Sequence, residues 1–498
     1  MQSTDFQIES IERNGVSLEK IKEQLSLFKR GTQYLNLQRS ATLGDGIKKV
    51  LEDEIFLYDN NYSRLVTDKK IVKFVPASGA ATRMFKDLFN YLESKQFTDF
   101  VEVFIKNLEK FAFYEELKSI LLKNKYKIGD LLANKSYSII IEYLLLDKGL
   151  SYGSLPKGLL SFHKEDNKIF NPIAEHLEES TAYAGSNPEL IFTVSEEFED
   201  GFKQAIEKEL QHIKYKNISY ALTFQKRETD TVAVTTDFQF VKKNEDELLL
   251  RPGGHGSLIE NLNEINADVI FIKNIDNVCS QSYLEETVRY KKTIASVLLE
   301  IQVKTFKYLE ILDKDQIVEE SLIEEIFSFL NKDLGLYYQS FFEMDKHEQI
   351  EFVKQKLNRP IRVCGMVKNE GEPGGGPFWV KDKEGVESLQ IVESSQINHA
   401  SKSQEKILLE STHFNPVDIV CSVKDFKGIK FDLTNFVDKD AYFIANKSFR
   451  GKEILALEHP GLWNGGMGNW NTIFVEVSSE TFNPVKTVND LLRKAHQN

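Results

Sequence analysis

Cysteine, long apolar runs and a surplus of basic residues are all scarce or missing in this chain of 498 residues. Its three cysteines, Cys279, Cys364 and Cys421, are too few for a disulfide framework and lack metal-binding spacing, so we expect each to be a small buried side chain. No stretch stays apolar for the ~18 residues of a membrane-spanning helix, and the first residues lack a signal-peptide pattern. We therefore expect a cytoplasmic protein with no membrane partner.

The charge balance argues against a nucleic-acid partner. The chain has 63 Lys and Arg residues against 76 Asp and Glu residues, which gives a formal net charge of −13. Proteins that bind nucleic acid by neutralising its phosphates need a basic surface. An anionic small molecule would instead require local Lys or Arg side chains, or a divalent cation.

A glycine-rich turn stands between two apolar runs in residues 247–278. The first run ends in the sequence Arg-Pro-Gly-Gly-His-Gly, which contains Gly253, Gly254 and His255. Ser257 and Glu260 then have the spacing of a capping box, and apolar residues recur at helical spacing. The pattern predicts a βαβ unit whose glycines let a flat or phosphorylated ligand approach the backbone.

The second apolar run of this unit, residues 269–272, is followed by Asn-Ile-Asp-Asn. Open α/β sheets bind ligands at the carboxyl ends of their strands. Asp276 therefore stands where a metal-binding carboxylate would be expected.

A loop of small residues follows the apolar run at residues 71–75, and an amphipathic helix pattern follows the loop. Such a loop offers backbone N–H groups and the positive end of a helix to phosphates, although a simple tight turn has the same composition. The residues in question are Ser78, Gly79, Ala80, Thr82 and Arg83.

Lys157 lies in a second loop, between Pro156 and Gly158 and shortly before another helix pattern. A solvated lysine is the ordinary interpretation. Its place in a loop that precedes a helix also suits an anion contact.

The remaining periodicities predict an α/β fold with a mixed, mostly parallel sheet flanked by helices. Helices are expected in residues 1–66, 86–150 and 281–357. Further strands are expected at residues 190–194, 218–224, 231–234, 361–367, 389–393 and 472–477.

Seven of these segments, in this order, resemble the UDP-sugar pyrophosphorylases of the UDP-N-acetylhexosamine and UDP-glucose types. The segments are residues 76–84, 156–158, 223–225, 252–256, 274–277, 391–396 and 482–487. In this order, they are similar to the family signatures L-x-G-G-x-G-T-R-[LM], P-K-G, F-x-Q, P-x-G-[NH]-G, N-[IV]-D-N, V-V-E-Y-S-E and F-S-P-L-K-N. The whole chain also resembles an uncharacterised bacterial family that carries a domain-of-unknown-function label.

The resemblance implies a GT-A-like nucleotide-diphospho-sugar transferase fold and a role for each matching residue. Arg83 and Lys157 would hold the triphosphate, Lys486 would hold phosphate at the reacting centre, and Asp276 would bind Mg²⁺. The nucleotide would contact Ser78, Gly79, Ala80, Thr82, Gln225, Gly253, Gly254 and His255, and the sugar would contact Gly365, Glu393 and Asn415.

Three residues depart from the family pattern. Ser78 and Ala81 stand where the family has glycines, and Gln396 stands where the sugar-side motif has a second glutamate. Glycine reaches backbone angles that Ser and Ala rarely adopt. The departures therefore concern the phosphate loop and the identity of the sugar.

The resemblance implies an enzyme that transfers a nucleoside monophosphate, UMP from UTP, to a sugar 1-phosphate and releases pyrophosphate. Its partners would be a nucleoside triphosphate and a sugar 1-phosphate, with Mg²⁺ as cofactor. Two alternatives stay open: a catalytically weak protein that binds nucleotide sugars, and nucleotidyl transfer to a phosphorylated non-sugar acceptor. The residues leave the sugar, the base and the oligomeric state open.

The length allows one large elaborated domain or two to three smaller ones. We expect an N-terminal helical segment at 1–66, a catalytic domain at 67–490 and a tail at 491–498. Within the catalytic domain, helical insertions are expected at about 86–150 and 281–357, and a substrate-side subregion at about 361–480.

Overall fold

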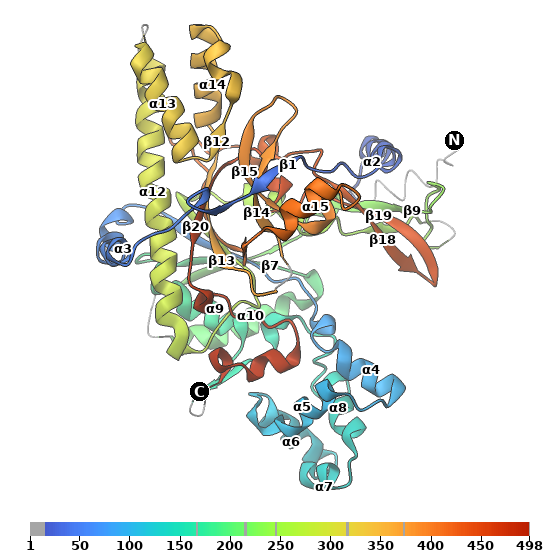
Figure 1. The fold of residues 1–498 in the computed structure, drawn as a ribbon. Coiled ribbons are helices and arrows are strands. Elements are labelled where there is room, and N and C mark those ends of the chain that lie inside the picture. Colours follow the sequence, from blue (N-terminus) through green and yellow to red (C-terminus); the bar gives the residue numbers. More distant parts are fainter. Residues whose placement is uncertain are drawn as a thin grey trace. The chain divides into compact units, whose positions relative to one another are not determined.

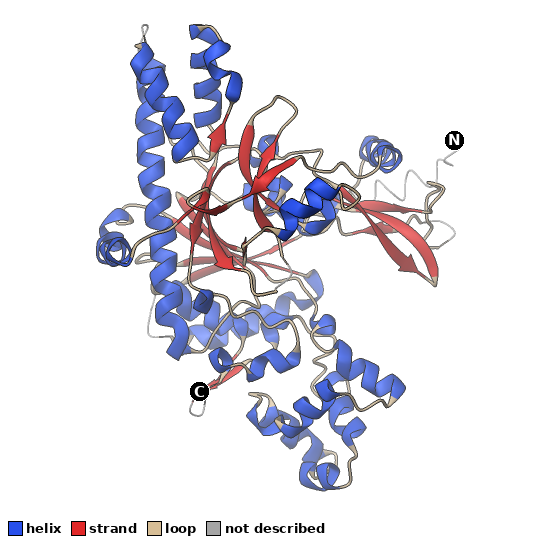
Figure 2. Ribbon diagram, in the orientation of Figure 1, coloured by secondary structure: helices blue, strands red, loops and turns tan. Residues whose placement is uncertain are grey.

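The computed structural model of the chain describes residues 15–165, 168–213, 217–244, 247–314, 318–371 and 374–497 (Figures 1 and 2). These residues form two compact units made of interleaved segments. The first unit comprises Met1–Lys70, Gln225–Phe271 and Thr293–Val477, and the second comprises Ile71–Phe224, Ile272–Lys292 and Ser478–Asn498.

The second unit contains three parallel strands, β4 (Ile71–Pro76), β7 (Glu189–Val194) and β8 (Ser219–Phe224), in that order. Their apolar side chains pack with helices α9 (Pro172–Ser180) and α10 (Glu199–Leu210) in one buried cluster. The three predicted strands are confirmed. Parallel pairing explains why β4 and β7 are almost continuously apolar, since strands covered on both faces need no polar alternation.

A group of helices is inserted after β4, as predicted for residues 86–150 (Figure 1). The group has an aromatic core in which Phe111 lies 5.2 Å from Phe104 and 5.0 Å from Phe113, measured between ring centroids. Val485 and Val488 of the last chain segment join this core. The helices are α4 (Lys86–Ser94), α5 (Asp99–Lys106), α6 (Tyr114–Lys123), α7 (Ile128–Ala133) and α8 (Tyr137–Leu145).

The rest of the second unit is a short hairpin, β5 (His163–Glu165) and β6 (Lys168–Phe170), and the C-terminal segment. The C-terminal segment forms 3-10 turns at Val488–Leu492 and Lys494–His496. Its Thr487 and Asp490 form a capping box at the first turn.

The first unit contains strands in the order β2, β3, β20, β13 and β17, followed by β11. β13 pairs with β20 in parallel and with β17 in an antiparallel manner, so the sheet is mixed and mostly parallel, as predicted. The edge strand β16 also pairs with β13. The bounds are β2 (Thr42–Leu43), β3 (Gly46–Lys48), β20 (Asn471–Glu476), β13 (Ile361–Lys368), β17 (Asp418–Ser422), β11 (Val269–Lys273) and β16 (His413–Phe414).

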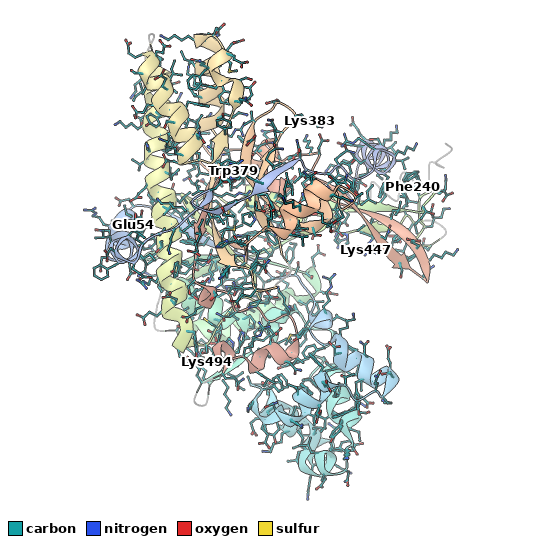
Figure 3. All side chains as sticks on the ribbon, in the orientation of Figure 1. Glu54, Phe240, Trp379, Lys383, Lys447 and Lys494 are labelled. Atoms are coloured by element: carbon teal, nitrogen blue, oxygen red, sulfur yellow. The ribbon has the colours of Figure 1, made fainter. Side chains whose placement is uncertain are left out.

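Two four-stranded sheets complete the strands of the first unit. One has the order β1 (Leu37–Ser40), β14 (Gly376–Lys381), β15 (Glu387–Val392) and β12 (Leu336–Tyr337). The other has the order β10 (Leu250–Arg251), β9 (Thr231–Val234), β19 (Lys452–Glu458) and β18 (Phe443–Phe449). Trp379 of β14 and Lys447 of β18 mark the two sheets in Figure 3.

The predicted βαβ unit is wrong. β10 pairs with β9 in an antiparallel manner, whereas β11 belongs to a different sheet. The helix between them, α11 (Leu258–Asn263), is short and follows a 3-10 turn at His255–Ser257. Ser257 already has helical backbone angles and its side chain makes no capping hydrogen bond with the described residues, so the predicted capping box is also wrong.

Residues 1–66 are less helical than predicted. Helices α2 (Leu18–Arg30) and α3 (Glu52–Leu65) are present, but β1, β2 and β3 lie between them. These strands are two to four residues long, too short to show a clear apolar period.

The long helices expected in residues 281–357 are present. α12 (Leu284–Lys314) is the longest, and α13 (Glu320–Lys332) and α14 (Lys346–Leu357) follow it. The last helix of the first unit is α15 (Lys402–Leu409).

All three cysteines are free and buried, as predicted. Among the helices that the structure describes, none combines the length and the apolar character needed to cross a membrane.

Candidate functional site

The predicted phosphate loop of the second unit is held against the loop that carries Lys157. Ala81 N donates to Leu155 O at 3.0 Å, Lys157 N donates to Gly79 O at 3.4 Å, and Ala80 and Pro156 form an isolated β-bridge. The helical insertion therefore leaves the loop and returns to it. Two motifs more than seventy positions apart in the sequence become neighbours.

Lys157 points its ammonium group at Asp276. Its Nζ donates to Asp276 Oδ2 at 2.8 Å and to Val485 O at 2.7 Å. The next residue has to be small, because a Cβ at Gly158 would lie 3.0 Å from the Phe202 ring. Close packing around Gly158 thus fixes the turn that aims Lys157.

Lys486 reaches the same carboxylate oxygen from the C-terminal segment. Its Nζ lies 3.1 Å from Asp276 Oδ2. The segment is attached to the residues after β11 by backbone contacts, because Val485 N donates to Asp276 O at 3.0 Å and Asn483 N donates to Asn277 Oδ1 at 2.8 Å. Lys157, Asp276 and Lys486, hereafter the two-lysine cluster, come from three distant parts of the sequence.

The electrostatics of the two-lysine cluster favour an anionic ligand. Burial by itself would raise the pKa of Asp276, but Lys157 and Lys486 outweigh it and hold this pKa below its ordinary value. The carboxylate is therefore ionised at neutral pH, and two ammonium groups face one negative charge. The Lys486 side chain is 58% exposed, so the surplus positive charge is open to solvent.

A buried histidine pair anchors the segment that carries Lys486. His163 Nδ1 lies 2.7 Å from Glu175 Oε1, and His163 Nε2 lies 2.8 Å from His496 Nδ1. Burial lowers the pKa of His496 to about 3, so the pair is neutral at pH 7. The C-terminal segment is therefore held before Lys486 by the backbone contacts of Asn483 and Val485, and after Lys486 by His496.

A second buried cluster of the same unit joins Glu179 of α9 to Lys73 of β4 and to Lys273, the last residue of β11. Glu179 accepts from Lys273 at 2.7 Å and forms an ion pair with Lys73 at 3.1 Å, and all three side chains are at most 3% exposed. Burial lowers the pKa of Lys73 to about 7, against the raising effect of Glu179. The lysines inside the apolar runs at 71–75 and 269–273 are a sequence signal for this cluster, because an unpaired lysine is rarely buried.

Arg83 is not brought to the two-lysine cluster by any described contact. It is exposed, and it makes no hydrogen bond or ion pair with the residues that the structure describes. Thr82 and Ser78 are engaged by their own surroundings, since Thr82 Oγ1 donates to Gly153 O at 3.3 Å and Ser78 O accepts from Ser195 at 3.5 Å.

No group of three or more His, Cys, Asp or Glu side chains with metal-binding geometry occurs among the described residues. Asp276 thus offers a single carboxylate to a cation, and its Oδ2 already accepts from two lysines. Mg²⁺ is commonly bound by one or two carboxylates together with substrate phosphates and water. The donor set fits Mg²⁺ that arrives with a phosphorylated substrate.

The glycine turn of the first unit is tight for reasons of internal packing. A Cβ at Gly253 would lie 2.2 Å from the His459 ring and 2.8 Å from Thr229 O, and Gly254 has a positive φ of 79°. The backbone of Gly253 accepts from His459 N at 2.9 Å. These glycines are required by the fold whether or not a base contacts them.

His255 and Glu393 lie next to each other in the first unit. His255 Nε2 lies 3.6 Å from Glu393 Oε1, and the His255 ring stacks on Trp463 with centroids 4.2 Å apart. Leu462 N donates to His255 Nδ1 at 3.1 Å, which places the ring proton on Nε2, towards Glu393. Burial raises the pKa of Glu393, but contacts with His255, Asn464 and Trp463 hold it below its ordinary value.

Other predicted sugar-side residues are occupied by internal contacts. Asn415 Nδ2 donates to Gly365 O at 2.9 Å, and Asn415 Oδ1 accepts from Val417 N at 3.1 Å. Gln396 is buried and accepts from Glu393 N at 3.0 Å, so it supports the turn that carries Glu393. Gln225 makes no hydrogen bond with any described residue of its unit.

Sequence reasoning missed the backbone acceptor of the two-lysine cluster. The carbonyl oxygen of Val485 accepts from Lys157, and a backbone acceptor has no residue-type signal. It also missed Trp463, whose ring stacks on His255.

The sequence matches one family, and the structure is similar to several solved structures. The sequence model of a family described as "Domain of unknown function (DUF4301)" matches residues 4–497. No curated protein matches the sequence. Similar solved structures include the uridine diphosphate N-acetylglucosamine pyrophosphorylase of Trypanosoma brucei, with 11% identity, a TM-score of 0.47, and coverage of 95% of this chain and 74% of that chain. A mutant UDP-glucose pyrophosphorylase of Leishmania major in complex with UDP-glucose has 13% identity, a TM-score of 0.43, and coverage of 99% and 79%.

Proposed function

The chain belongs to the DUF4301 family, and we propose that it is a nucleotidyltransferase that moves UMP from UTP to a sugar 1-phosphate and releases pyrophosphate. The single observation that carries the proposal is the two-lysine cluster. Motif residues from three distant segments, Lys157, Asp276 and Lys486, meet within hydrogen-bond distance.

The chemistry calls for this type of site. A sugar 1-phosphate oxygen attacks the α-phosphorus of the triphosphate, the bond from that phosphorus to the bridging oxygen of the β-phosphate breaks, and pyrophosphate leaves. Both reactants are anions, so the barrier comes mainly from charge repulsion and from in-line alignment. Positive groups that hold both phosphates are therefore more useful here than a nucleophile or a general base.

The residues of the cluster divide this task. Lys157 is fixed by Asp276 and Val485 O, so its ammonium group is preorganised towards one position. Lys486 is anchored by one contact to Asp276 and is largely exposed, so it can turn to the incoming sugar phosphate. Asp276 would hold Mg²⁺ bound to the triphosphate, and the ion would neutralise charge on the phosphate oxygens.

The first unit by itself carries two side chains whose chemistry suits a nucleotide sugar. The Glu393 carboxylate is ionised and next to His255, so it can accept hydrogen bonds from sugar hydroxyls. Gln225 has an amide with a donor and an acceptor, which suits the uracil edge.

Release of pyrophosphate tests the proposal. Purified protein is incubated with UTP, Mg²⁺ and a panel of sugar 1-phosphates, and pyrophosphate is measured. We expect Lys157→Met to lower kcat/KM by about 10²–10³-fold, the usual effect of removing one preorganised charge-stabilising group. Lys494→Met is the matched control, because Lys494 is an exposed lysine of the same C-terminal segment (Figure 3) and has no contact with Asp276.

Two results would reject the proposal. One is absence of pyrophosphate release with every acceptor while a known UDP-sugar pyrophosphorylase is active in the same assay. The other is equal activity of wild type and Lys157→Met.

A catalytically weak nucleotide-sugar binding protein is the second candidate. It is favoured by the exposed Arg83, which has no described partner, and by the engagement of both lysines with Asp276. It predicts that UDP-sugars raise the melting temperature without turnover, and that Asp276→Asn leaves this shift intact. Loss of the shift in that variant, or pyrophosphate release by the wild type, would reject it.

A further inference from the structure

The first unit encloses a cavity of about 990 Å³ that the proposed function does not use. Its walls come from the end of α14, from β14 and β15 with the turn between them, and from residues 435–441 and 464–472. Such a volume lies at the upper end of the range of small-molecule pockets. Every residue that lines the cavity belongs to the first unit.

Lys356 is a buried lysine without a partner on this cavity. Its residue is 4% exposed, and its Nζ makes no hydrogen bond or ion pair with any residue that the structure describes. The Nζ lies over the Phe352 ring, 5.3 Å from its centroid. An ammonium group removed from water without an anion costs free energy, and burial followed by repulsion from Arg359 lowers the pKa of Lys356.

Arg359 supplies a second cation to the same wall. Its Nε donates to Gln355 O at 3.2 Å and its Nη1 donates to Asn469 O at 3.3 Å. Both acceptors are neutral backbone carbonyls, and within the described part of the chain no carboxylate forms an ion pair with the guanidinium. The forked Nη edge suits two oxygens of one phosphate.

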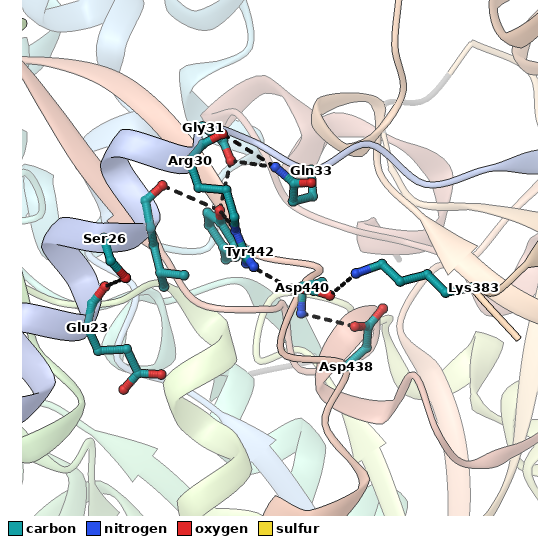
Figure 4. Close-up of polar contacts among 10 residues, drawn as sticks. Glu23, Ser26, Arg30, Gly31, Gln33, Lys383, Asp438, Asp440 and Tyr442 are labelled. Atoms are coloured by element: carbon teal, nitrogen blue, oxygen red, sulfur yellow. Dashed lines mark hydrogen bonds and ion pairs between the residues drawn. The ribbon is translucent and has the colours of Figure 1, made fainter.

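Most acidic residues of the walls are held by other contacts. Asp440 accepts from Arg30 at 2.8 Å and from Lys383 at 2.5 Å, and Asp438 accepts from the backbone of Asp440 at 3.0 Å (Figure 4). Glu351 and Asp313 pair with Lys354 and Lys427. Asp382, which accepts from its own turn, and Glu384 attract both cations electrostatically, but neither forms an ion pair with them.

Three further residues of the walls have polar atoms without a partner. The indole Nε1 of Trp470 and the amide Oδ1 atoms of Asn464 and Asn471 are buried and form no hydrogen bond with the described residues. Gln390, by contrast, donates to Gly468 O at 2.8 Å. The cavity therefore combines polar atoms of both kinds with two cations that form no ion pair with a described carboxylate.

We propose that this cavity is a binding site for a small phosphorylated metabolite with several hydroxyl groups, and that Lys356 and Arg359 bind its phosphoryl group. A phosphate ester brings about two negative charges, which match the two cations, and offers three terminal oxygens for their donors. The hydroxyl groups face the amides and carboxylates of the opposite walls. The site is independent of the two-lysine cluster, because it lies wholly in the other unit.

Calorimetric titration tests this site, with inorganic phosphate, ribose 5-phosphate and ribose as probes. We expect ribose 5-phosphate to bind the wild type, and the dissociation constant to rise at least tenfold in Lys356→Met and in Arg359→Met. Lys346→Met is the matched control, because Lys346 is an exposed lysine of the same helix that does not line the cavity. Lys157→Met should also bind normally, which separates this site from the two-lysine cluster.

The melting temperature gives a second readout, because the substitution of a lysine with a purely structural role would lower it. We expect free Lys356→Met to melt at the same or a higher temperature than the wild type, because the substitution removes an uncompensated buried charge. Unchanged affinity for ribose 5-phosphate in Lys356→Met would overturn the proposal. So would equal affinity for ribose, or loss of binding in Lys157→Met but not in Lys356→Met.

Discussion

The two cation pairs of this protein are arranged in opposite ways. In the second unit, Lys157 and Lys486 share one oxygen of Asp276. In the first unit, Lys356 and Arg359 have no ion pair within the described part of the chain. The first pair has a carboxylate partner within the fold, whereas the second pair is attracted by Asp382 and Glu384 without an ion pair and, in our proposal, binds an anionic ligand. The number of cations in a site is thus less informative about ligand binding than whether those cations already have carboxylate partners.

The largest effect on stability is expected from removing the shared carboxylate. Asp276→Asn leaves the partly buried ammonium of Lys157 with only a backbone acceptor, so we expect the free energy of unfolding to fall by about 3 kcal/mol. Urea unfolding measures this change. The double variant Asp276→Asn/Lys157→Met should recover much of the loss, and a double variant as unstable as the single one would break the comparison.

Lys73 offers an intermediate case, since it is fully buried and shares Glu179 with Lys273. Its folded pKa of about 7 lies below the unfolded value of 10.5, so the folded state binds fewer protons between these pH values. The free energy of unfolding should therefore rise with pH in that window, by on the order of 2 kcal/mol from pH 7 to pH 9 relative to Lys73→Met. Urea unfolding of both proteins at several pH values checks this difference, and parallel pH dependences would contradict it.

For the uncompensated pair the sign is reversed. Lys356→Met is expected to raise the free energy of unfolding by about 1 kcal/mol, because no ion pair is lost and a buried charge is removed. Thermal and urea unfolding of the free protein measure the effect, with Lys346→Met as the control. A clear loss of stability would mean that the lysine has a partner that compensates it.

The smallest effect is expected at the exposed end of the two-lysine cluster. Lys486→Met should change the free energy of unfolding by less than about 0.5 kcal/mol, because an exposed ion pair contributes little. Its kcat/KM should nevertheless fall. If Lys486→Met and Asp276→Asn lowered the free energy of unfolding equally, the Lys486 contact would stabilise the fold as much as the shared carboxylate does, which would contradict this expectation.

Much of the strand pattern could be predicted from the sequence. β4, β7, β8 and β13 are apolar runs bounded by turn residues, and the structure confirms them. The pairing of the short strands could not be predicted from the sequence. β10 has two residues, and an apolar period cannot say which sheet so short a strand will join.

The sequence predicted those residues of the candidate site that belong to recognisable motifs. Lys157, Asp276 and Lys486 belong to three motif segments, and the structure brings them together. Lys356 was missed because a lysine in the last turn of a helix usually stabilises the dipole and faces solvent. Only tertiary packing shows that this lysine is buried without a carboxylate.

The fate of the α-phosphate tests the central claim most directly. UTP labelled at its α-phosphorus is incubated with the protein, Mg²⁺ and a sugar 1-phosphate, and the products are separated by mass. The account predicts that the label appears in a UDP-sugar, that the released pyrophosphate is unlabelled, and that Lys157→Met slows both while Lys494→Met does not. Label found in free UMP or left in UTP, with an active relative as control, would contradict it.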